Sequence, residues 1–600
     1  MQNPIELGGE VMLRSSKGSF LVFLLVCLPV SAFETSEIYG QQEANVVVLR
    51  GATVIDGLGN PPLTDATVVV EGDTIQSIRS GQDTDYPAGA TVIDVTGRFI
   101  IPGLVDTHVH WGAWMGEIYV NHGVTSVLAL ANVSQEERAN SRSSLSTPRV
   151  FHTGGNTRLT PSMTREQVHD RIQEILNNEP DVVWFTQFRD NIKDAYGWAA
   201  EQVHAEGLTI FSHAQDTGQA IDRGMGVAEH VWGFALPLMS PQELEDFKEG
   251  RILHWATYLK EGKELDQLIQ KAVSQGVFLN PTLVYEWGSL SPKVKQREQE
   301  VYLLLSDPDL SYYPPVRGEV LLLHHRTIKA YSSRYDHLPM VSKLSPEDLE
   351  VIQDARRNVQ RFVKSYVQAG GKIVAGTDAP GVATPGIGMH HEMELLVEAG
   401  LTPMQALQSS TSWGGDMLAG FRGARGNQRV GSLQVGNFAD LLILEADPLK
   451  DISNTKKIER VMKGGKFIEF GYHPEFFSLS GPPRSTLEPE ISAISPHRVV
   501  EGSPDFEIVI DGAGFVTQSV VQVDGVSLRT IFEGPRGLRA TVPARFIEKA
   551  LPDRFRRSGP DQNVGVFGER SLSITVFNPP PSGGVSNRVL LMVQAEWHVR

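Results

Sequence analysis

Two stretches of alternating apolar and polar residues, far apart in the chain, predict short β-strands separated by turns. The first extends from Asn45 to Ile101 and contains VVVLRGATVIDG, ATVVVEGDTIQSI and ATVIDVTGRFI; the second, from Val430 to Phe470, contains VGSLQVGNFADLLILEAD and IERVMKGGKFIEF. β-Branched residues bounded by Gly and Asp are typical of strands. We therefore expect one small β-sandwich formed from both flanks, by residues 45–101 and 426–472.

Between these flanks, apolar runs alternate with segments of helical periodicity. The runs are SVLALAN, VVWFTQF, TIFSHA, GVFLNPTL and KIVAGTD. Such alternation favours a parallel sheet in an α/β fold, here a (β/α)₈ TIM barrel over residues 102–425. This stretch exceeds the roughly 250 residues of a minimal barrel, so insertions are expected. The charged segment from Trp287 to Glu347 is the candidate insertion, and we expect it to act as a lid.

Beyond Phe470 the composition shifts to Pro, Ser and Gly, and GPPRSTLEPE predicts a linker over residues 473–490. The runs FEIVIDG, SVVQVDG, SLSITVF and RVLLMVQ follow, separated by turn residues. Short alternating strands of this kind indicate an all-β immunoglobulin-like sandwich over residues 491–598.

The first residues are of a different kind. Arg14 and Lys17 precede the apolar run from Phe20 to Val30, which ends in Val30-Ser31-Ala32. A charged region, a short apolar run and a small-residue site predict a secretory signal peptide over residues 1–32. The run is too short for the roughly 20 residues of a spanning helix, so no stable membrane span is expected after cleavage. The protein is thus predicted to be exported, to the periplasm or outside the cell.

Composition narrows the chemistry. The single cysteine lies inside the predicted signal peptide, so the mature chain has neither disulfides nor thiolate ligands, and any metal must be held by nitrogen and oxygen. The formal net charge of -17 opposes nucleic-acid binding. A small molecule is the expected partner.

The run IPGLVDTHVH places His108 and His110 two residues apart after an apolar strand. Side chains at i and i+2 point to the same side of a strand, so the two rings form a pair of nitrogen ligands at the strand end. A lone His-x-His is more often structural or incidental. The strand context, at the junction of sandwich and barrel, favours a metal site.

PGLVDTHVH, GTDAP, HHEMELLVEAGLTPMQALQSST and GSLQVGNFADLLIL together resemble the amidohydrolase superfamily, in its imidazolonepropionase-like and Xaa-Pro dipeptidase-like branch. The resemblance covers roughly residues 46–470. It implies metal ligands at the ends of barrel strands 1, 5, 6 and 8, which in this chain are His108, His110, His213, His230 and Asp378. It further implies that Asp378 and His230 act in catalysis.

The chain departs from the family pattern at barrel strand 4. Trp184 stands where binuclear members carry a lysine whose carboxylated side chain bridges two metals. An indole cannot ligate a metal in this way. One ion is therefore expected rather than two, and zinc is the expected ion, although manganese, iron and cobalt accept the same ligands.

The resemblance implies a metal-dependent hydrolase that cleaves a C–N bond, in an amide, a cyclic amide or an Xaa-Pro-type dipeptide. Metal-activated water would attack a carbonyl polarised by the metal or by His230, and Asp378 would transfer the proton. Two alternatives stay open: a degraded barrel that serves as a surface binding protein, and a mononuclear-metal deaminase.

Other residues have weaker signals. His152 is interpreted either as a pocket residue or as a surface-loop residue, and Tyr285 as a packing residue that could also reach substrate. The pair His390 and His391 is interpreted as part of a capping or solvated helix face. Residues 491–598 resemble the IPT/TIG immunoglobulin-like family, for which contact with a surface glycan or protein and a purely stabilising role both stay open.

Overall fold

The computed structural model describes residues 46–81, 85–305, 307–310, 327–328, 339–380, 383–473, 489–547, 569–578 and 585–594. The predicted signal peptide and much of the predicted lid lie outside these ranges. Within the described residues, no helix combines the length and apolar character needed to cross a membrane.

One mixed sheet contains strands from both flanks of the α/β region, in the order β17-β16-β15-β5-β1-β2-β3 with β4 beside β1. Its strands are β1 (Val46–Val54), β2 (Leu63–Glu71), β3 (Thr74–Ser80), β4 (Thr91–Asp94), β5 (Phe99–Pro102), β15 (Leu441–Leu444), β16 (Ile458–Lys463) and β17 (Lys466–Phe467). The fully buried β15 pairs antiparallel with β5, which joins segments more than three hundred residues apart in sequence.

The α/β region is TIM-barrel-like. Its strands form a three-stranded parallel sheet, β6-β7-β8, and a six-stranded parallel sheet, β9 to β14. They are β6 (Leu104–Val109), β7 (Val124–Ala129), β8 (Arg149–His152), β9 (Asn156–Thr157), β10 (Val182–Phe188), β11 (Thr209–Ala214), β12 (Val227–Glu229), β13 (Phe278–Asn280) and β14 (Lys372–Ile373). Complete closure of the barrel stays a prediction.

Backbone hydrogen bonds bring the first and last of these strands together. Thr107 N–H donates to the Ala375 carbonyl at 3.0 Å, and Asp378 N–H donates to the His108 carbonyl at 2.9 Å. The carboxyl end of β6 therefore lies beside the segment that follows β14. In TIM barrels this end of the strands carries the functional residues.

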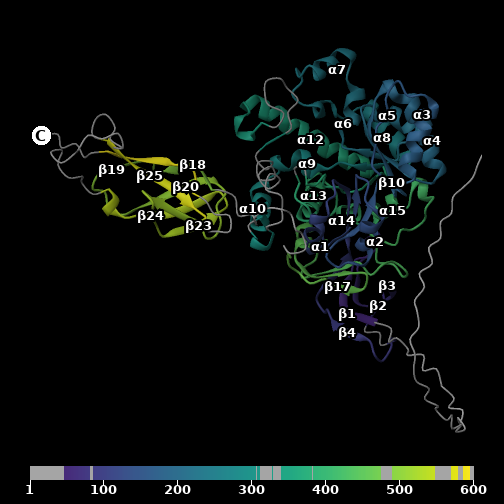
Figure 1. Ribbon diagram of the computed structural model, residues 1–600, viewed down its shortest axis with the longest axis horizontal. Helices are drawn as coiled ribbons and strands as arrows, with labels where there is room; N and C mark the ends of the chain where they lie inside the picture. The colour runs from purple at the N-terminus through teal and green to yellow at the C-terminus, as the bar shows by residue number, and fades with distance from the viewer. Residues whose placement is uncertain are drawn as a thin grey trace, which may run out of the picture. The chain divides into compact units, whose positions relative to one another are not determined.

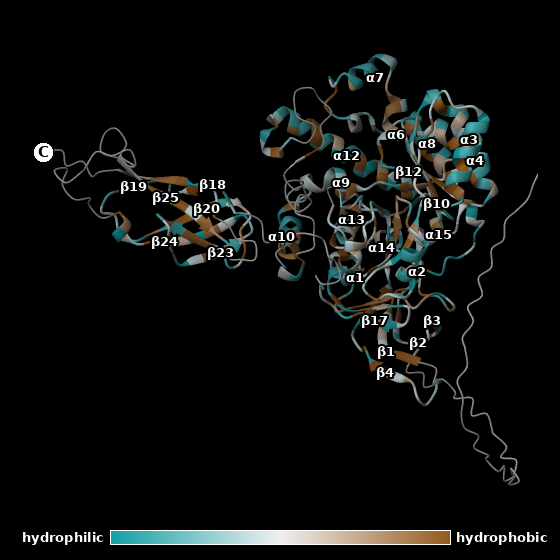
Figure 2. Cartoon of the chain, in the orientation of Figure 1, coloured by the Kyte–Doolittle hydropathy of each residue, from teal (hydrophilic) through white to brown (hydrophobic). Residues whose placement is uncertain are grey.

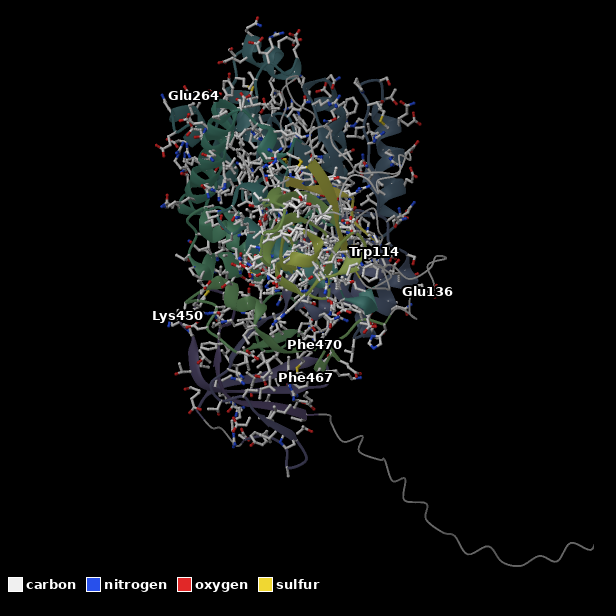
Figure 3. All side chains as sticks on the ribbon, turned by 90° about the vertical axis from the view of Figure 1, so that its left-hand side faces the viewer. Trp114, Glu136, Glu264, Lys450, Phe467 and Phe470 are labelled. Atoms are coloured by element: carbon white, nitrogen blue, oxygen red, sulfur yellow. The ribbon has the colours of Figure 1, made fainter. Side chains whose placement is uncertain are left out.

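Helices surround the strands (Figure 1). They are α1 (Gly116–Asn121), α2 (Gln135–Ser143), α3 (Arg165–Leu176), α4 (Lys193–Ala205), α5 (Thr217–Asp222), α6 (Trp232–Ala235), α7 (Pro241–Lys248), α8 (Lys263–Ser274), α9 (Leu283–Trp287), α10 (Val294–Leu305), α12 (Pro346–Gln368), α13 (Ile387–Glu398), α14 (Pro403–Ser409) and α15 (Ser412–Leu418). Their outer faces are largely hydrophilic (Figure 2), and charged side chains such as Glu136, Glu264 and Lys450 lie at the periphery (Figure 3).

The C-terminal segment folds into two further sheets with a hydrophobic core of their own. One contains β18 (Glu490–Ser495), β20 (Phe506–Ala513), β23 (Thr530–Gly534) and β24 (Gly537–Val542); the other contains β19 (Arg498–Val500), β21 (Val520–Val523), β22 (Val526–Ser527), β25 (Glu569–Phe577) and β26 (Val589–Gln594). Ile510, Val521 and Ile574 are fully buried between them. The specific IPT/TIG resemblance stays a prediction.

Candidate metal centre

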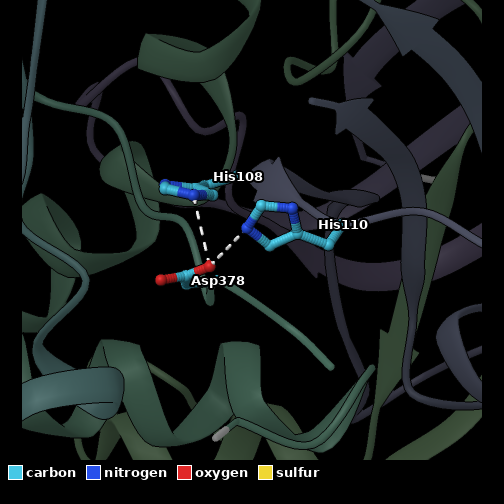
Figure 4. A group of neighbouring side chains, drawn as sticks. All are labelled: His108, His110 and Asp378. Carbon is cyan, nitrogen blue, oxygen red and sulfur yellow. Dashed lines mark ion pairs between the residues drawn. The ribbon is translucent and has the colours of Figure 1, made fainter. Parts of the chain in front are cut away.

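The structure brings the five predicted ligands together at the carboxyl ends of the barrel strands. His108 and His110 lie at and just after the end of β6, and both approach Asp378, as Figure 4 shows. Asp378 Oδ1 lies 3.4 Å from His108 Nε2 and 2.9 Å from His110 Nε2. Asp378 Oδ2 lies 4.0 Å from His230 Nε2. Among the described residues, two groups of side chains are spaced closely enough to hold a metal ion. The first consists of His108, His110 and Asp378.

The second group contains a residue that the sequence analysis missed. It consists of His213, His230 and the fully buried carboxylate of Glu229 at the end of β12. Glu229 Oε1 lies 3.0 Å from His213 Nε2 and 3.2 Å from His108 Nε2. This carboxylate therefore connects the two groups.

A left-handed backbone explains how neighbouring residues reach the same centre. Successive side chains of a strand point to opposite faces, so Glu229 and His230 should diverge. His230, however, has φ +58, and Asp378 and Thr282 share this unusual region with φ +58 and +45. Non-glycine residues adopt it rarely, at a cost of about 1–3 kcal/mol. Three such residues in contact with one cluster indicate a functional site.

Hydrogen bonds at the far nitrogens fix the orientation of two rings. His213 Nδ1 donates to the Thr186 carbonyl at 2.9 Å, because a carbonyl can only accept. The Thr282 hydroxyl donates to the Pro281 carbonyl, so His230 Nδ1 donates to Thr282 Oγ1 at 2.5 Å. A neutral ring then presents an unprotonated Nε2 to the centre, as a metal ligand must. This arrangement indicates that His230 Nε2 acts as a metal ligand rather than as a hydrogen-bond donor to the substrate carbonyl.

The carboxylates and imidazoles of the site shift one another's pKa values in opposite directions. Burial would raise the pKa of the Glu229 carboxyl, but the His213 and His108 rings lower it to about 2. The pKa of Asp378 is likewise held well below its ordinary value, where burial is outweighed by His108 and His110. Conversely, burial would lower the pKa of His108, yet Asp378 and Glu229 raise it to about 9. Two buried carboxylates thus require positive charge between them.

A cavity of about 740 Å³ opens onto this cluster. Aromatic side chains form much of its wall: Trp184, Trp232, Phe247, Trp255 and Tyr285. The Tyr285 ring stacks on His230 with centroids 5.8 Å apart. Tyr285 therefore lines the cavity, where it could reach a substrate; of its two interpretations, a packing role is the one that the sequence favours. A volume of this size matches pockets for small ligands.

Two of the weaker interpretations are wrong. His390 and His391 are buried rather than solvated: His390 is hydrogen-bonded to Thr455, and His391 to Glu300. His152 is fully buried and is hydrogen-bonded to the Val133 N–H and the Glu179 carbonyl, so it is neither a pocket residue nor a surface residue. Their roles are structural.

Gly376 allows the strands to approach beneath the cluster. A Cβ at this position would lie 2.5 Å from His108 Cβ and 2.6 Å from Asn280 Nδ2. We expect Gly376→Ala to lower the stability of the fold by about 1–3 kcal/mol, because a packed core tolerates added volume poorly. Thermal unfolding measures this change. Gly197→Ala in α4 is the control: among the described residues, no atom outside the backbone of this helix lies within 4 Å of the added Cβ, so the change should be neutral or stabilising.

Glu392 holds the first turn of α9, the helix that follows Thr282 and carries Tyr285. Its carboxyl group accepts the backbone N–H groups of Leu283 at 2.9 Å and Val284 at 2.6 Å. Burial raises the pKa of Glu392 to about 8, although these two hydrogen bonds oppose the shift. The pKa of a glutamate in an unfolded chain is about 4.3.

This difference predicts a pH dependence of stability. The folded chain keeps the Glu392 proton up to about pH 8, whereas the unfolded chain loses it at about pH 4. The contribution of Glu392 to the free energy of unfolding is therefore complete below about pH 4 and is lost as the pH rises through 8. We expect the thermal unfolding midpoint to fall between about pH 5 and 8 more steeply in the natural chain than in Glu392→Gln. Equal slopes would contradict the assignment.

The sequence is similar to those of known proteins over part or most of its length. The sequence model of the amidohydrolase family matches residues 99–468, more than half of the chain. An uncharacterized protein of Mycobacterium tuberculosis is 33% identical over 96 residues, which cover 15% of each chain. An imidazolonepropionase of Streptomyces griseus is 42% identical over 48 residues, 8% of this chain and 12% of the enzyme. The matches thus span about 15% or less of these relatives' length.

Solved structures resemble the chain in fold. A Xaa-Pro dipeptidase with bound methionine in the active site is 18% identical, with a TM-score of 0.50, over 71% of this chain and all of that one. A prolidase from Bifidobacterium longum, described as putative, is 20% identical, with a TM-score of 0.49, over 72% and 96% of the two chains. Identities this low describe the fold alone.

Proposed function

Because the chain belongs to the amidohydrolase family, we propose that it is an exported, metal-dependent hydrolase that cleaves a C–N bond in a small amide or cyclic amide. The observation that carries this proposal is the convergence of four imidazoles and two carboxylates at the strand ends, beside a cavity of about 740 Å³. Xaa-Pro-type dipeptides belong to the candidate substrates.

The donor set fits a divalent metal ion. Glu229 Oε1 is buried and accepts no hydrogen bond within the described part of the chain, yet it faces the Nε2 atoms of two histidines. Nitrogen and oxygen donors suit zinc, and also manganese, iron and cobalt. His108, His110 and Asp378 would hold such an ion, with His213 and His230 facing the same centre. When bound, the ion would supply Lewis-acid chemistry, which acidifies water and polarises a carbonyl group.

Asp378 is the proposed proton carrier. Its Oδ2 atom faces the centre and lies 4.0 Å from His230 Nε2, whereas Oδ1 contacts His108 and His110. A carboxylate here can accept the proton of the attacking water as the new C–O bond forms, and return it to the nitrogen as the C–N bond breaks. The aromatic wall binds the apolar part of the substrate and limits the access of bulk water.

Elemental analysis and a substrate panel test this proposal. The purified chain should hold tightly bound divalent metal and hydrolyse at least one of a panel of Xaa-Pro dipeptides, N-acyl amino acids and lactams. His108→Ala should lose metal and activity together. Protein that binds no zinc, manganese or iron and stays inert after each is supplied would instead indicate a binding protein.

The proposed export rests on residues 1–32, outside the described part of the chain. Cleavage after Ala32 would leave Phe33 as the first residue of the mature protein. N-terminal sequencing of protein recovered outside the cytoplasm should find this residue. An intact Met1 would contradict the proposal.

A further inference from the structure

Trp184 and Glu229 form a buried pair within the cluster. Trp184 lies on β10, and its indole Nε1 donates a hydrogen bond to Glu229 Oε2 at 3.0 Å. Both residues are almost fully buried, at 7% and 3% exposure. The Trp184 ring also packs edge-on between His110 and His213, with centroids 6.2 and 6.4 Å away. The indole thus occupies the space between the ligands and fixes one oxygen of Glu229.

The other oxygen of Glu229 is left for the centre. With Oε2 held by the indole, Oε1 points between His213 Nε2 at 3.0 Å and His108 Nε2 at 3.2 Å. A buried carboxylate oxygen in this position requires positive charge beside it, which protonated histidines or a metal ion can supply. This orientation is the one that a metal-ligating carboxylate requires.

The neighbouring imidazoles complete a donor set around that oxygen. His213 and His230 rings stack with centroids 5.0 Å apart, and their Nδ1 atoms donate to Thr186 and Thr282. Their Nε2 atoms therefore face Glu229 with free lone pairs in the neutral rings. Two nitrogens and one carboxylate oxygen lie beside a second set of the same composition, His108, His110 and Asp378.

We propose that Glu229 completes a second divalent-metal site with His213 and His230, and that Trp184 is the positioning residue that holds its carboxylate there. Trp184 cannot ligate a metal, and for this reason the sequence alone predicts one ion. In the structure this substitution does not exclude a second ion, because the Trp184 indole holds the Glu229 carboxylate at the centre in place of the lysine. This inference rests on the proposed function, because the first site must bind metal for a pair to form.

Manganese titration of the full chain after chelation tests the inference. Equilibrium dialysis should find two equivalents of Mn²⁺ in the natural chain, and electron paramagnetic resonance should show the exchange-coupled signal of a metal pair. Glu229→Gln should bind one equivalent and give only an uncoupled signal. Trp184→Phe, which removes the indole N–H, should weaken the second equivalent by about tenfold, as is usual when a ligand loses its supporting hydrogen bond.

Controls separate loss of the site from loss of the fold. Glu201→Gln, at an exposed position on α4, should retain two equivalents. If Glu229→Gln fails to fold, His213→Asn tests the same site and should also leave one equivalent. One equivalent in the natural chain, unchanged in Glu229→Gln, would overturn the inference: Glu229 would then only balance the charge of the histidines, and the proposed function would stand. No bound metal in the natural chain would instead overturn the proposed function.

Discussion

Asparagine in place of Asp378 is expected to lower kcat by about 10²- to 10⁴-fold, the usual contribution of a positioned general acid–base group. The amide can still offer an oxygen to a cation, but it cannot accept the proton of the attacking water. The effect should appear in kcat measured at saturating metal and substrate. Metal content, measured on the same sample, should fall much less than kcat.

The matched control for this variant is a carboxylate outside the cluster. Asp416→Asn removes a charge from an exposed ion pair with Lys372 and should leave kcat unchanged. An Asp378→Asn variant that retains full kcat would show that proton transfer passes through another group. Parallel loss of metal and kcat would assign Asp378 to metal binding alone.

Alanine in place of Asp440 is expected to give the largest loss of stability, about 3–5 kcal/mol. Asp440 accepts hydrogen bonds from Arg149 Nε at 2.7 Å and Arg149 Nη2 at 3.1 Å, and from Gly464 N–H at 2.6 Å. The ion pair of Arg149 and Asp440 connects β8 of the barrel to the flanking sheet, because Arg149 lies in β8 and Asp440 directly precedes β15. Asp440→Ala would leave a buried guanidinium without its counter-charge.

The measurement is the shift of the apparent unfolding midpoint, by heat and by denaturant. Glu201→Ala breaks the exposed ion pair with Arg165, and this control should cost less than about 1 kcal/mol. The double variant Arg149→Met with Asp440→Leu should recover much of the loss, because apolar residues can replace a buried ion pair. An Asp440→Ala loss no larger than the surface control would contradict the assignment.

Much of the fold and of the first ligand group could be predicted from the sequence. Apolar runs that alternate with helical segments identify barrel strands, and the carboxyl ends of those strands meet at one edge. Ligands placed at strand ends must therefore converge, which is why His108, His110 and Asp378 lie together despite wide separation in sequence.

Glu229 could not be assigned in this way. Strand alternation places it opposite His230, and only the left-handed backbone of His230 turns both side chains to one centre. A charged residue at the end of an otherwise apolar strand, beside a predicted ligand, was the available signal. The burial of His390 and His391 was equally hidden, because their partners Thr455 and Glu300 are distant in sequence.

Anomalous diffraction from a crystal of the metal-loaded chain tests the central claim most directly. We predict an anomalous peak at about 2 Å from His108 Nε2, His110 Nε2 and an Asp378 oxygen, the usual distance for a divalent ion. No peak at this position, or metal bound only at residues elsewhere on the chain, would contradict the assignment of a metal-dependent hydrolase.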